Sequence, residues 1–160
     1  MMMLAVEPLP ESYRPWLAEL LTREWGSARI VTRGKVHNAT ELPALLAWLE
    51  ESPAGVITYR IAGDECEIVT LNSVIVGRGA ASALLDAVRM AAEKAGCRRL
   101  WLITTNDNTD ALEFYQKRGF HLKAVYPDAI EESRRLKPEI PLTGRNGIPI
   151  RDEMELERCW

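Results

Sequence analysis

The pattern of apolar and polar residues predicts a helix over residues 12–25, whose sequence is SYRPWLAELLTREW. Its tryptophans and leucines recur three and four positions apart, which is the spacing of one helix face. Ser12 is suited to cap the first turn, and Pro15 falls where a missing N–H costs least. Gly26 follows the last apolar residue and is expected to end the helix.

Three short apolar segments follow, and they predict strands at 42–49, 54–61 and 65–74. The first of them, LPALLAWL, suits a helix equally well by its composition. We interpret it as a strand because the next two segments are short and because residues 51–53 and 62–64 are typical of tight turns. Together the three segments predict an antiparallel meander.

After Val76 the pattern changes to helices that alternate with strands. Apolar residues on one face predict a helix over 80–95, which Gly96 is expected to end. The other predicted elements are a strand at 98–104, a helix at 109–118, a strand at 120–125, a short helix at 128–136 and a last strand at 150–158. We therefore expect a single α/β domain over residues 1–160, built on a mixed sheet.

Charge and cysteine content exclude several classes of protein. A formal net charge of −3 over 160 residues argues against a nucleic-acid partner, which would require a basic surface. No apolar run approaches the roughly 18 residues of a membrane span, and no signal peptide is recognised, so we expect no membrane partner. Cys66, Cys97 and Cys159 form no metal-binding pattern with His37 and His121, and free thiols predict a cytoplasmic location.

A glycine-rich loop joins the strand at 65–74 to the helix at 80–95. Small residues let the backbone approach a ligand, and the N–H groups that begin a helix favour an anion such as a diphosphate. A turn that binds nothing would explain the same residues. The loop lacks the P-loop pattern, and Ser82 stands where a dinucleotide fingerprint has Gly or Ala.

A second motif, about 30 residues further on, surrounds the helix at 109–118. Asn108 is suited to cap this helix, Ala111 and Tyr115 share one face, and Gly119 supplies a left-handed end before Phe120 begins the next strand. A well-capped core helix would explain these residues individually. It does not explain their occurrence together with the upstream loop.

The two motifs in this order resemble the GNAT superfamily of acetyl-CoA-dependent N-acetyltransferases, over Glu67 to Val125. The pattern N-x-x-A-x-x-x-Y-x-x-x-G-F is matched without a gap. The cofactor motif [QR]-x-x-G-x-[GA] aligns with Val76-Gly77-Arg78-Gly79-Ala80-Ala81, where Val76 replaces Gln or Arg. The resemblance implies acetyl-CoA as cofactor, with CoA as product, and a mixed sheet flanked by helices on both faces.

In this family two central parallel strands separate, and the pantetheine arm lies between them; here they would be 65–74 and 98–104. The resemblance then places backbone groups of Leu71, Ser73 and Val74 on the pantetheine, with Asn108 beside it. The diphosphate would lie on Val76, Gly77, Arg78, Gly79, Ala80, Ala81 and Ser82. Tyr115 would be the acid that protonates the leaving thiolate.

The base that takes the amine proton is open on sequence alone. Glu67 occupies the central strand, where several family members carry a catalytic Glu. Asp152 is a rival, because it shares the apolar side of the last predicted strand, where burial would favour its protonated form. Glu153, Glu155 and Glu157 take the other side and are expected to form a solvated face. Water could also accept the proton.

The resemblance implies transfer of an acetyl or short acyl group to a primary amine. The acidic residues Glu65, Glu67 and Asp152 near the expected cleft favour a cationic small molecule over a protein as the acceptor. Cys66 and Cys97 are not expected to be nucleophiles, because direct transfer needs no acyl-enzyme. An acyl-CoA-binding regulatory module without efficient turnover is the alternative. The segment 127–149 is longer than a strand connection needs, and we expect it to shape the acceptor site or a homodimer surface.

Overall fold

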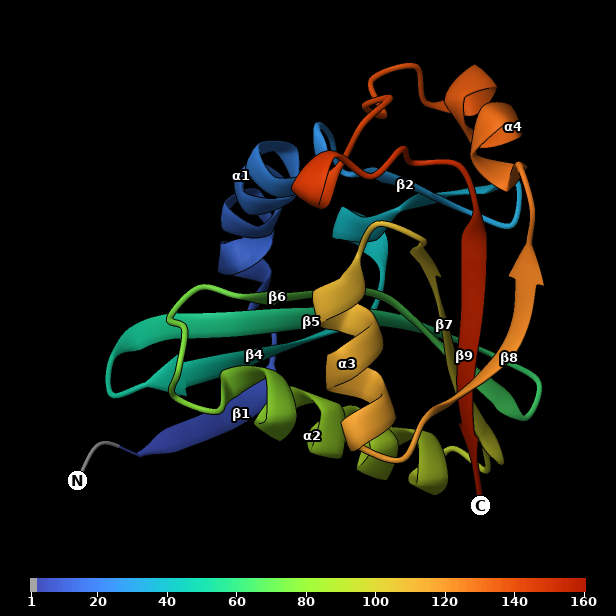
Figure 1. The fold of residues 1–160 in the computed structure, drawn as a ribbon. Coiled ribbons are helices and arrows are strands. Elements are labelled where there is room, and N and C mark those ends of the chain that lie inside the picture. Colours follow the sequence, from blue (N-terminus) through green and yellow to red (C-terminus); the bar gives the residue numbers. More distant parts are fainter. Residues whose placement is uncertain (1–2) are drawn as a thin grey trace.

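The computed structural model describes residues 3–160, which form one mixed seven-stranded sheet, a small hairpin and four α-helices (Figure 1). The sheet runs in the order β1 (Leu4–Pro8), β4 (Ala44–Leu49), β5 (Ser52–Ala62), β6 (Glu65–Ser73), β7 (Arg99–Thr105), β9 (Glu153–Cys159) and β8 (His121–Tyr126). The hairpin pairs β2 (Arg29–Thr32) with β3 (Lys35–Asn38). The helices are α1 (Arg14–Trp25), α2 (Ala80–Lys94), α3 (Thr109–Lys117) and α4 (Ala129–Leu136).

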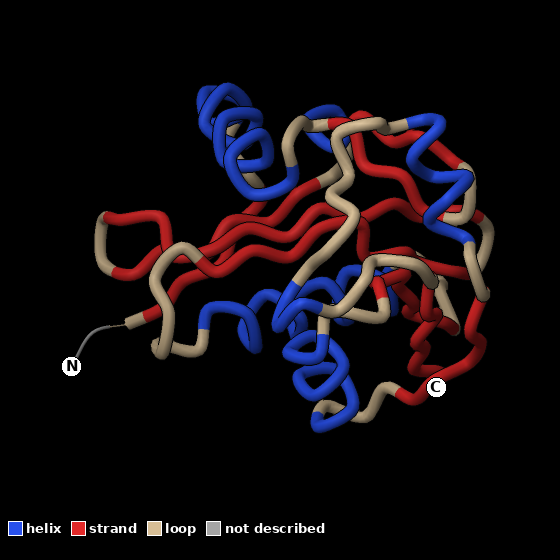
Figure 2. Tube along the Cα trace, turned by 45° about the horizontal axis from the view of Figure 1, so that its top comes forward, coloured by secondary structure: helices blue, strands red, loops and turns tan. Residues whose placement is uncertain are grey.

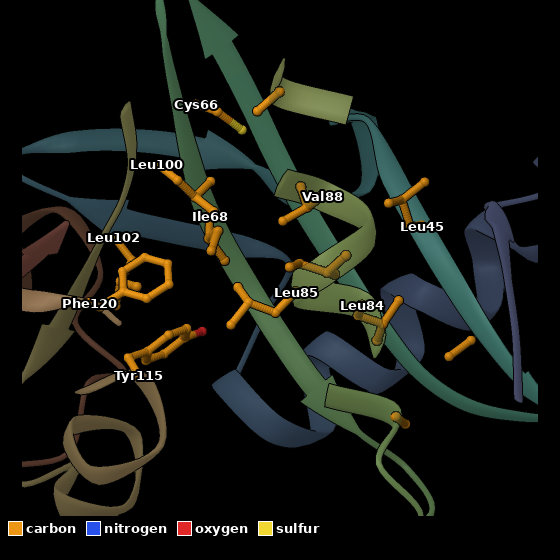
Figure 3. Packing of buried hydrophobic residues seen from close by; sticks show 14 of the residues in the cluster. Leu45, Cys66, Ile68, Leu84, Leu85, Val88, Leu100, Leu102, Tyr115 and Phe120 are labelled. Carbon is orange, nitrogen blue, oxygen red and sulfur yellow. The ribbon is translucent and has the colours of Figure 1, made fainter. Parts of the chain in front are cut away.

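Helices cover both faces of the sheet, as Figure 2 shows. On one side α2 and α3 pack against the main core, which includes Ile68, Leu84, Leu100 and Phe120 (Figure 3). We call this the helical face. On the other side α1 packs against Val56 and Val69, and the β2–β3 hairpin lies beside it. We call this the hairpin face; on β6 and β7 it carries Glu65, Glu67, Arg99 and Trp101.

The predicted strands and helices are present, with ends displaced by a few residues. The ambiguous segment 42–49 is a strand, because β4 lies between β1 and β5 and is buried on both sides. The helix expected from Ser12 begins at Arg14 instead, and Ser12 lies in a short 3₁₀ turn. Gly26 ends that helix with φ +85°, as predicted. In residues 3–160, no helix is both long and apolar enough to cross a membrane.

The strands β6 and β7 separate, as expected of the family fold. Their parallel pairing runs only from Glu65 opposite Arg99 to Ile68 opposite Leu102, although β6 continues to Ser73. A β-bulge causes the divergence: Thr58 of β5 pairs with Thr70, but Tyr59 pairs with Ile68, so Val69 is an extra residue in β6. Bulges bend a strand and increase its twist. The strands β7, β8 and β9 accordingly cross the direction of β4 to β6 steeply (Figure 1).

Gly55 lets the first turn of α2 pack closely on the sheet. A Cβ at this position would lie 2.9 Å from the carbonyl oxygen of Asn72 and 3.1 Å from Leu84 Cδ1. The backbone oxygen cannot move away without breaking the β5–β6 pairing. Only glycine therefore fits at position 55 without displacing its neighbours.

We expect Gly55→Ala to lower the free energy of unfolding by about 1–3 kcal/mol, the usual cost of an extra methyl group in a filled site. Urea unfolding followed by circular dichroism measures it. Ser52→Ala, at the exposed end of the same strand, is the control and should change stability by less than about 0.5 kcal/mol. Equal stabilities for the two variants would contradict the close packing.

Candidate active site

The loop between β6 and α2 has the geometry of an anion site. Gly77 and Gly79 have φ values of +81° and +80°, which residues with a side chain rarely adopt. Gly79 immediately precedes α2, and no side chain among the described residues caps this end. The N–H groups of Ala80, Ala81 and Ser82 therefore point out of the helix, where they and the helix dipole favour a phosphate.

Arg118 adds a positive charge beside this helix end. Its Nε and Nη2 atoms donate to Ser82 Oγ at 3.0 and 2.7 Å, and its guanidinium stacks on Phe114 at 3.7 Å. The contact joins the end of α3 to the beginning of α2. Arg118 adjoins Gly119 in the second motif, but no pattern in the sequence singles it out. Arg78 and Val76 are exposed, and Val76 is 84% exposed.

Beyond Ile68, β6 has no pairing with β7, and its edge presents backbone N–H and C=O groups to the gap between these two strands. Val74 N–H donates to Ala54 O at 2.7 Å, so this residue is turned toward β5. Because an antiparallel ladder alternates, Leu71 and Ser73 direct their N–H and C=O groups the other way, toward the separated β7. The expectation for Leu71 and Ser73 thus fits the geometry. The contact expected of Val74 stays a prediction, and its N–H, which is bonded to Ala54 O, is not available for it.

Tyr115 and Asn108 stand on the helical face of the gap. Asn108 caps α3 by accepting a hydrogen bond from Ala111 N–H at 3.3 Å, as predicted. The Tyr115 ring lies between Phe114 and Phe120, with centroid distances of 5.1 and 5.3 Å. Its hydroxyl points toward Leu85 and β6 (Figure 3). Burial raises the pKa of Tyr115, so the phenol keeps its proton at neutral pH.

Glu67 stands on the opposite, hairpin face, next to the last paired residues of β6 and β7. Its side chain is 2% exposed. Arg60 Nε donates to Oε1 at 2.9 Å, and Thr32 Oγ1 donates to Oε2 at 2.8 Å. A small pocket of about 60 Å³ opens beside the carboxylate, lined by Arg60, Ala62, Glu65, Glu67 and Trp101.

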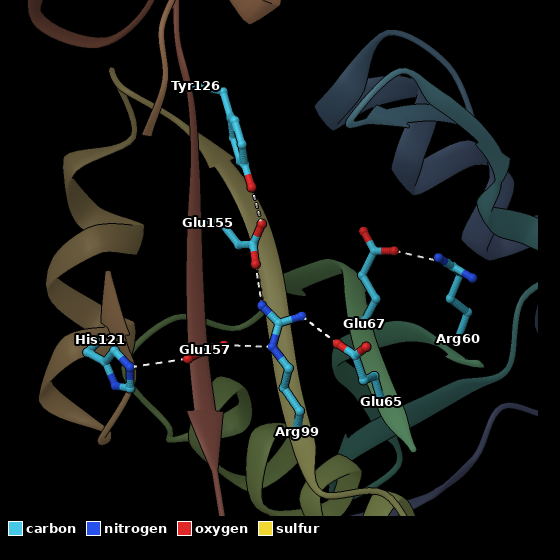
Figure 4. Close-up of polar contacts among 8 residues, drawn as sticks. All are labelled: Arg60, Glu65, Glu67, Arg99, His121, Tyr126, Glu155 and Glu157. Carbon is cyan, nitrogen blue, oxygen red and sulfur yellow. Dashed lines mark hydrogen bonds and ion pairs between the residues drawn. The ribbon is translucent and has the colours of Figure 1, made fainter. Parts of the chain in front are cut away.

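The glutamates of β9 do not form the solvated face that the alternation predicts. Glu153, Glu155 and Glu157 are 2%, 8% and 9% exposed. They share the hairpin face with β6 and β7, where Arg99 donates to Glu65 and Glu157 at 2.6 Å each and also to Glu155 (Figure 4). The prediction was wrong because paired carboxylates can be buried where unpaired ones cannot.

Neighbouring groups complete this network. Tyr126 donates from its hydroxyl to Glu155 at 2.7 Å, and this bond raises the pKa of Tyr126. Arg33 donates to Glu153 at 3.0 Å and lies over the Tyr126 ring. His121 Nε2 is 3.4 Å from Glu157 (Figure 4). The hydrogen bond from Arg99 lowers the pKa of Glu157.

Asp152 does not occupy the expected position. It precedes β9, which begins at Glu153, and its Oδ1 accepts from Arg151 Nε and from Asp128 N–H at 2.8 Å each. These bonds, with Arg151 first, lower the pKa of Asp152. A carboxylate of this kind holds a proton poorly, which is the opposite of what an apolar strand face would produce.

Cys66 and Cys97 are buried, whereas Cys159 is exposed. Burial is the main cause that raises the pKa of Cys66 to about 12, and burial also raises that of Cys97. Both thiols therefore stay protonated at neutral pH, as the sequence suggested. No group of three potential metal ligands is present within residues 3–160.

Several residues of the site are hard to recognise as functional from a single sequence. Arg99 was detectable in principle, because it alternates with Leu100 and Leu102 on a predicted strand and must face the opposite side of the sheet. Thr32 and His37 belong to a hairpin that was not predicted. Its turn, Arg33-Gly34, has φ values of +48° and +73°, where Asn-Gly is the usual choice.

Comparison with known proteins gives a consistent result. Residues 5–120 match the family described as "Acetyltransferase (GNAT) family". The chain is 42% identical over 153 residues to the uncharacterized protein YdhI of Bacillus subtilis, covering 95% of this chain and 96% of the relative.

Solved structures share the fold at low identity. The IAA acetyltransferase from Bacillus cereus has a TM-score of 0.75 at 21% identity, covering 99% of this chain and all of its own. A GNAT family acetyltransferase from Elizabethkingia anophelis, solved with acetyl-CoA bound, has a TM-score of 0.71 at 19% identity, with 98% of each chain covered.

The Arg99 network predicts a stability effect that depends on pH. Arg99→Met leaves two largely buried carboxylates, those of Glu155 and Glu157, and the partly exposed carboxylate of Glu65 without their shared cation. We expect the free energy of unfolding to fall by about 3–5 kcal/mol at pH 7. Arg99 lowers the pKa of Glu157 in the folded protein. The stabilisation from this ion pair is therefore fully present above the pKa of a glutamate in the unfolded chain, about 4.3, and is lost as the pH falls through the lower pKa of the folded protein. The deficit should therefore shrink in strong acid.

Urea unfolding at pH 7 and near pH 3 measures the deficit. Arg89→Met is the matched control, because Arg89 forms a more exposed pair with Glu93 and should change stability by less than about 1 kcal/mol. A deficit that is small at pH 7, or the same at both pH values, would contradict the role given to Arg99.

Proposed function

The chain belongs to the GNAT acetyltransferase family, and we propose that it transfers an acetyl or short acyl group from acetyl-CoA to a primary amine. The observation that carries this proposal is the placement of Glu67 and Tyr115 on opposite faces of the sheet, where β6 and β7 separate. A base on one face and an acid on the other suit a reaction in which the amine enters from one side and the thiol leaves from the other.

The cofactor half of the proposal is supported by the phosphate-binding geometry of the loop. The outward N–H groups of Ala80, Ala81 and Ser82 would hold the diphosphate, and Arg118 lies beside them. The free backbone groups of Leu71 and Ser73 would bind the amides of the pantetheine arm, as a missing strand would. Asn108 lies on the same face at the start of α3.

Acetyl-CoA supplies a thioester whose carbonyl carbon an unprotonated amine can attack, so that a C–N bond forms as the C–S bond breaks. Glu67 would take the proton that the amine loses. Tyr115 would give its hydroxyl proton to the sulfur, since a phenol that stays protonated at neutral pH can donate to a thiolate as it forms. We assign no proton transfer to Asp152, because its charged form is held by Arg151.

The acceptor is proposed to be a small cationic amine. Five carboxylates on the hairpin face, from Glu65, Glu67, Glu153, Glu155 and Glu157, oppose three guanidinium groups, from Arg33, Arg60 and Arg99. The excess of negative charge favours an ammonium group. Trp101 adds an aromatic wall to the small pocket beside Glu67, which suits a cation.

The segments around the hairpin face favour a small molecule over a protein. Arg29 Nη2 donates to Leu136 O at the end of α4 at 2.9 Å, and Arg33 bonds Glu153 at the start of β9. The hairpin and the segment 127–149 thus meet over this face, and we take this contact to favour a small acceptor over an extended peptide. This arrangement agrees with the expectation that the segment shapes the acceptor site.

A regulatory acyl-CoA-binding module is the second candidate, and Val76 is the observation that favours it. The family position of Gln or Arg is held here by a valine that is 84% exposed and can give no polar side-chain contact to a cofactor. Measured turnover separates the two candidates. An enzyme releases CoA thiol in proportion to acetylated amine, whereas a module binds acetyl-CoA without releasing thiol.

Binding of acetyl-CoA is the first test. We expect saturable binding by isothermal titration, with NADH as a ligand that does not bind. Ala81→Glu should weaken binding about 10-fold or more relative to Ala81→Gln, because only the first places a negative charge at the phosphate site. Both variants should fold, since an acidic residue is favourable in a first helical turn. Undetectable binding to the wild type would refute the proposed function.

Turnover tests the two catalytic groups. Tyr115→Phe should lower kcat by about 10-fold or more while acetyl-CoA still binds, because the acid is lost. Tyr13→Phe is the control, because the Tyr13 ring packs against Trp48 of β4 on the other face. Glu67→Gln should remove the acid limb of the pH–rate profile. Glu113→Gln, which changes an exposed side chain of α3, should leave that limb in place. Thiol release with a panel of amines measures both, and unchanged kcat in either variant would remove that residue from the mechanism.

A further inference from the structure

We infer that the β2–β3 hairpin positions the carboxylate of Glu67 through a hydrogen-bonded chain that runs from His37 through Thr32. This inference rests on the proposed function, because it concerns the base of that reaction. Neither residue belongs to the two motifs of the sequence. They act on the site from a two-stranded hairpin outside the main sheet.

The chain is short and buried. Thr32 and His37 project from the same side of the hairpin, Thr32 on β2 and His37 on β3, and they are 5% and 4% exposed. Thr32 Oγ1 lies 2.7 Å from His37 Nε2 and 2.8 Å from Glu67 Oε2. His37 Nε2 is itself 4.0 Å from Glu67 Oε1, so the hydroxyl is the direct link.

The direction of both hydrogen bonds follows from the ionised carboxylate, which can only accept. The single hydroxyl proton of Thr32 is therefore directed to Glu67 Oε2. Thr32 Oγ1 must then accept from His37, which requires the tautomer with a proton on Nε2. With Arg60 on Oε1, a donor holds each carboxylate oxygen, and the plane of the group is fixed.

His37 is neutral at physiological pH. Burial, with smaller contributions from the charges of Arg60 and Lys35, lowers its pKa to about 4. Because its Nε2 already carries a proton directed to Thr32, the imidazole has no place on that atom for the proton that leaves the amine. The chain therefore orients Glu67, and the amine proton stays on Glu67. His37 and Thr32 are positioning residues.

The hairpin is fixed firmly enough to do this. Its start is held by Arg29, which bonds Leu136 O, and its turn by Arg33, which bonds Glu153. After β3, Ala39 N–H donates to Ala28 O at 2.9 Å and closes the base of the hairpin. Arg33 also stacks on Tyr126 at 3.5 Å. These contacts tie the hairpin that carries Thr32 to β8 and β9.

Kinetics of Thr32→Val test the inference. We expect kcat to fall roughly 10–100-fold, within the range that loss of acid–base catalysis spans, while the affinity for acetyl-CoA is unchanged. The acid limb of the pH–rate profile should also move to higher pH, because a donor to the charged carboxylate is lost. The charged and titratable groups around this carboxylate are Arg60 on β5, His37 and Lys35 on β3, Glu65 on β6 and Arg99 on β7.

Two matched variants separate positioning from folding. Thr32→Ser keeps the hydroxyl and should restore both kcat and the acid limb to near wild-type values. Val36→Thr changes an exposed side chain of the same hairpin and should leave the kinetics unchanged. If Thr32→Val binds acetyl-CoA normally and keeps the wild-type kcat and acid limb, the positioning role is overturned.

A spectroscopic measurement is independent of turnover. Nitrogen-15 spectra of the imidazoles should show neutral His37 with its proton on Nε2 at pH 7, and His121→Asn identifies the other histidine. A proton on Nδ1 would overturn the chain. If His37 has the expected tautomer but the wild type acetylates no amine, the proposed function fails and the catalytic role of the chain fails with it, whereas the hydrogen bonds stand.

Discussion

The site depends on one interruption of hydrogen bonding, the end of the parallel ladder between β6 and β7 after four residue pairs. Beyond Ile68 and Leu102 the bulge at Val69 turns β6 away, and backbone donors and acceptors of Leu71 and Ser73 lose a strand partner. Unpaired backbone groups are costly unless water or a ligand satisfies them. A flexible ligand that carries amides is therefore well suited to this gap, and the groups on the two faces are arranged around it.

A ladder of four pairs is a weak join at the centre of a sheet, and the Arg99 network reinforces it. Arg99 stands on β7 and bonds Glu65 of β6 on one side and Glu155 and Glu157 of β9 on the other. One guanidinium thus ties three strands, and its bond to Glu65 crosses the short β6–β7 ladder. The same charges give the hairpin face its acidic character, so the stability of the sheet and the proposed preference for a cationic acceptor have a common origin.

Much of the fold could be predicted from the sequence, including the loop that we expect to hold the cofactor, because local features determine these parts. Helix periodicity located α2 and α3, and glycines at positive φ marked the loop and the helix ends. The hairpin face could not be predicted in this way. Glu153, Glu155 and Glu157 look like a solvated face until their partners are known. These are Arg33 for Glu153 and Arg99, more than 50 residues earlier in the chain, for Glu155 and Glu157. Thr32 and His37 reach Glu67 only through a hairpin whose Arg33-Gly34 turn has an unusual composition.

The position of β9 between β7 and β8 has a consequence for the order of assembly. Until β9 is in place, β8 has no neighbour in the sheet and β7 has one only along its first four residues. The backbone bonds of this half of the sheet therefore form late and all join residues distant in the chain, which is the arrangement that slows folding. While the chain is being synthesised, β1 to β6 and α2 can assemble early, whereas the carboxylates of β9 reach Arg99 only when that last strand is inserted.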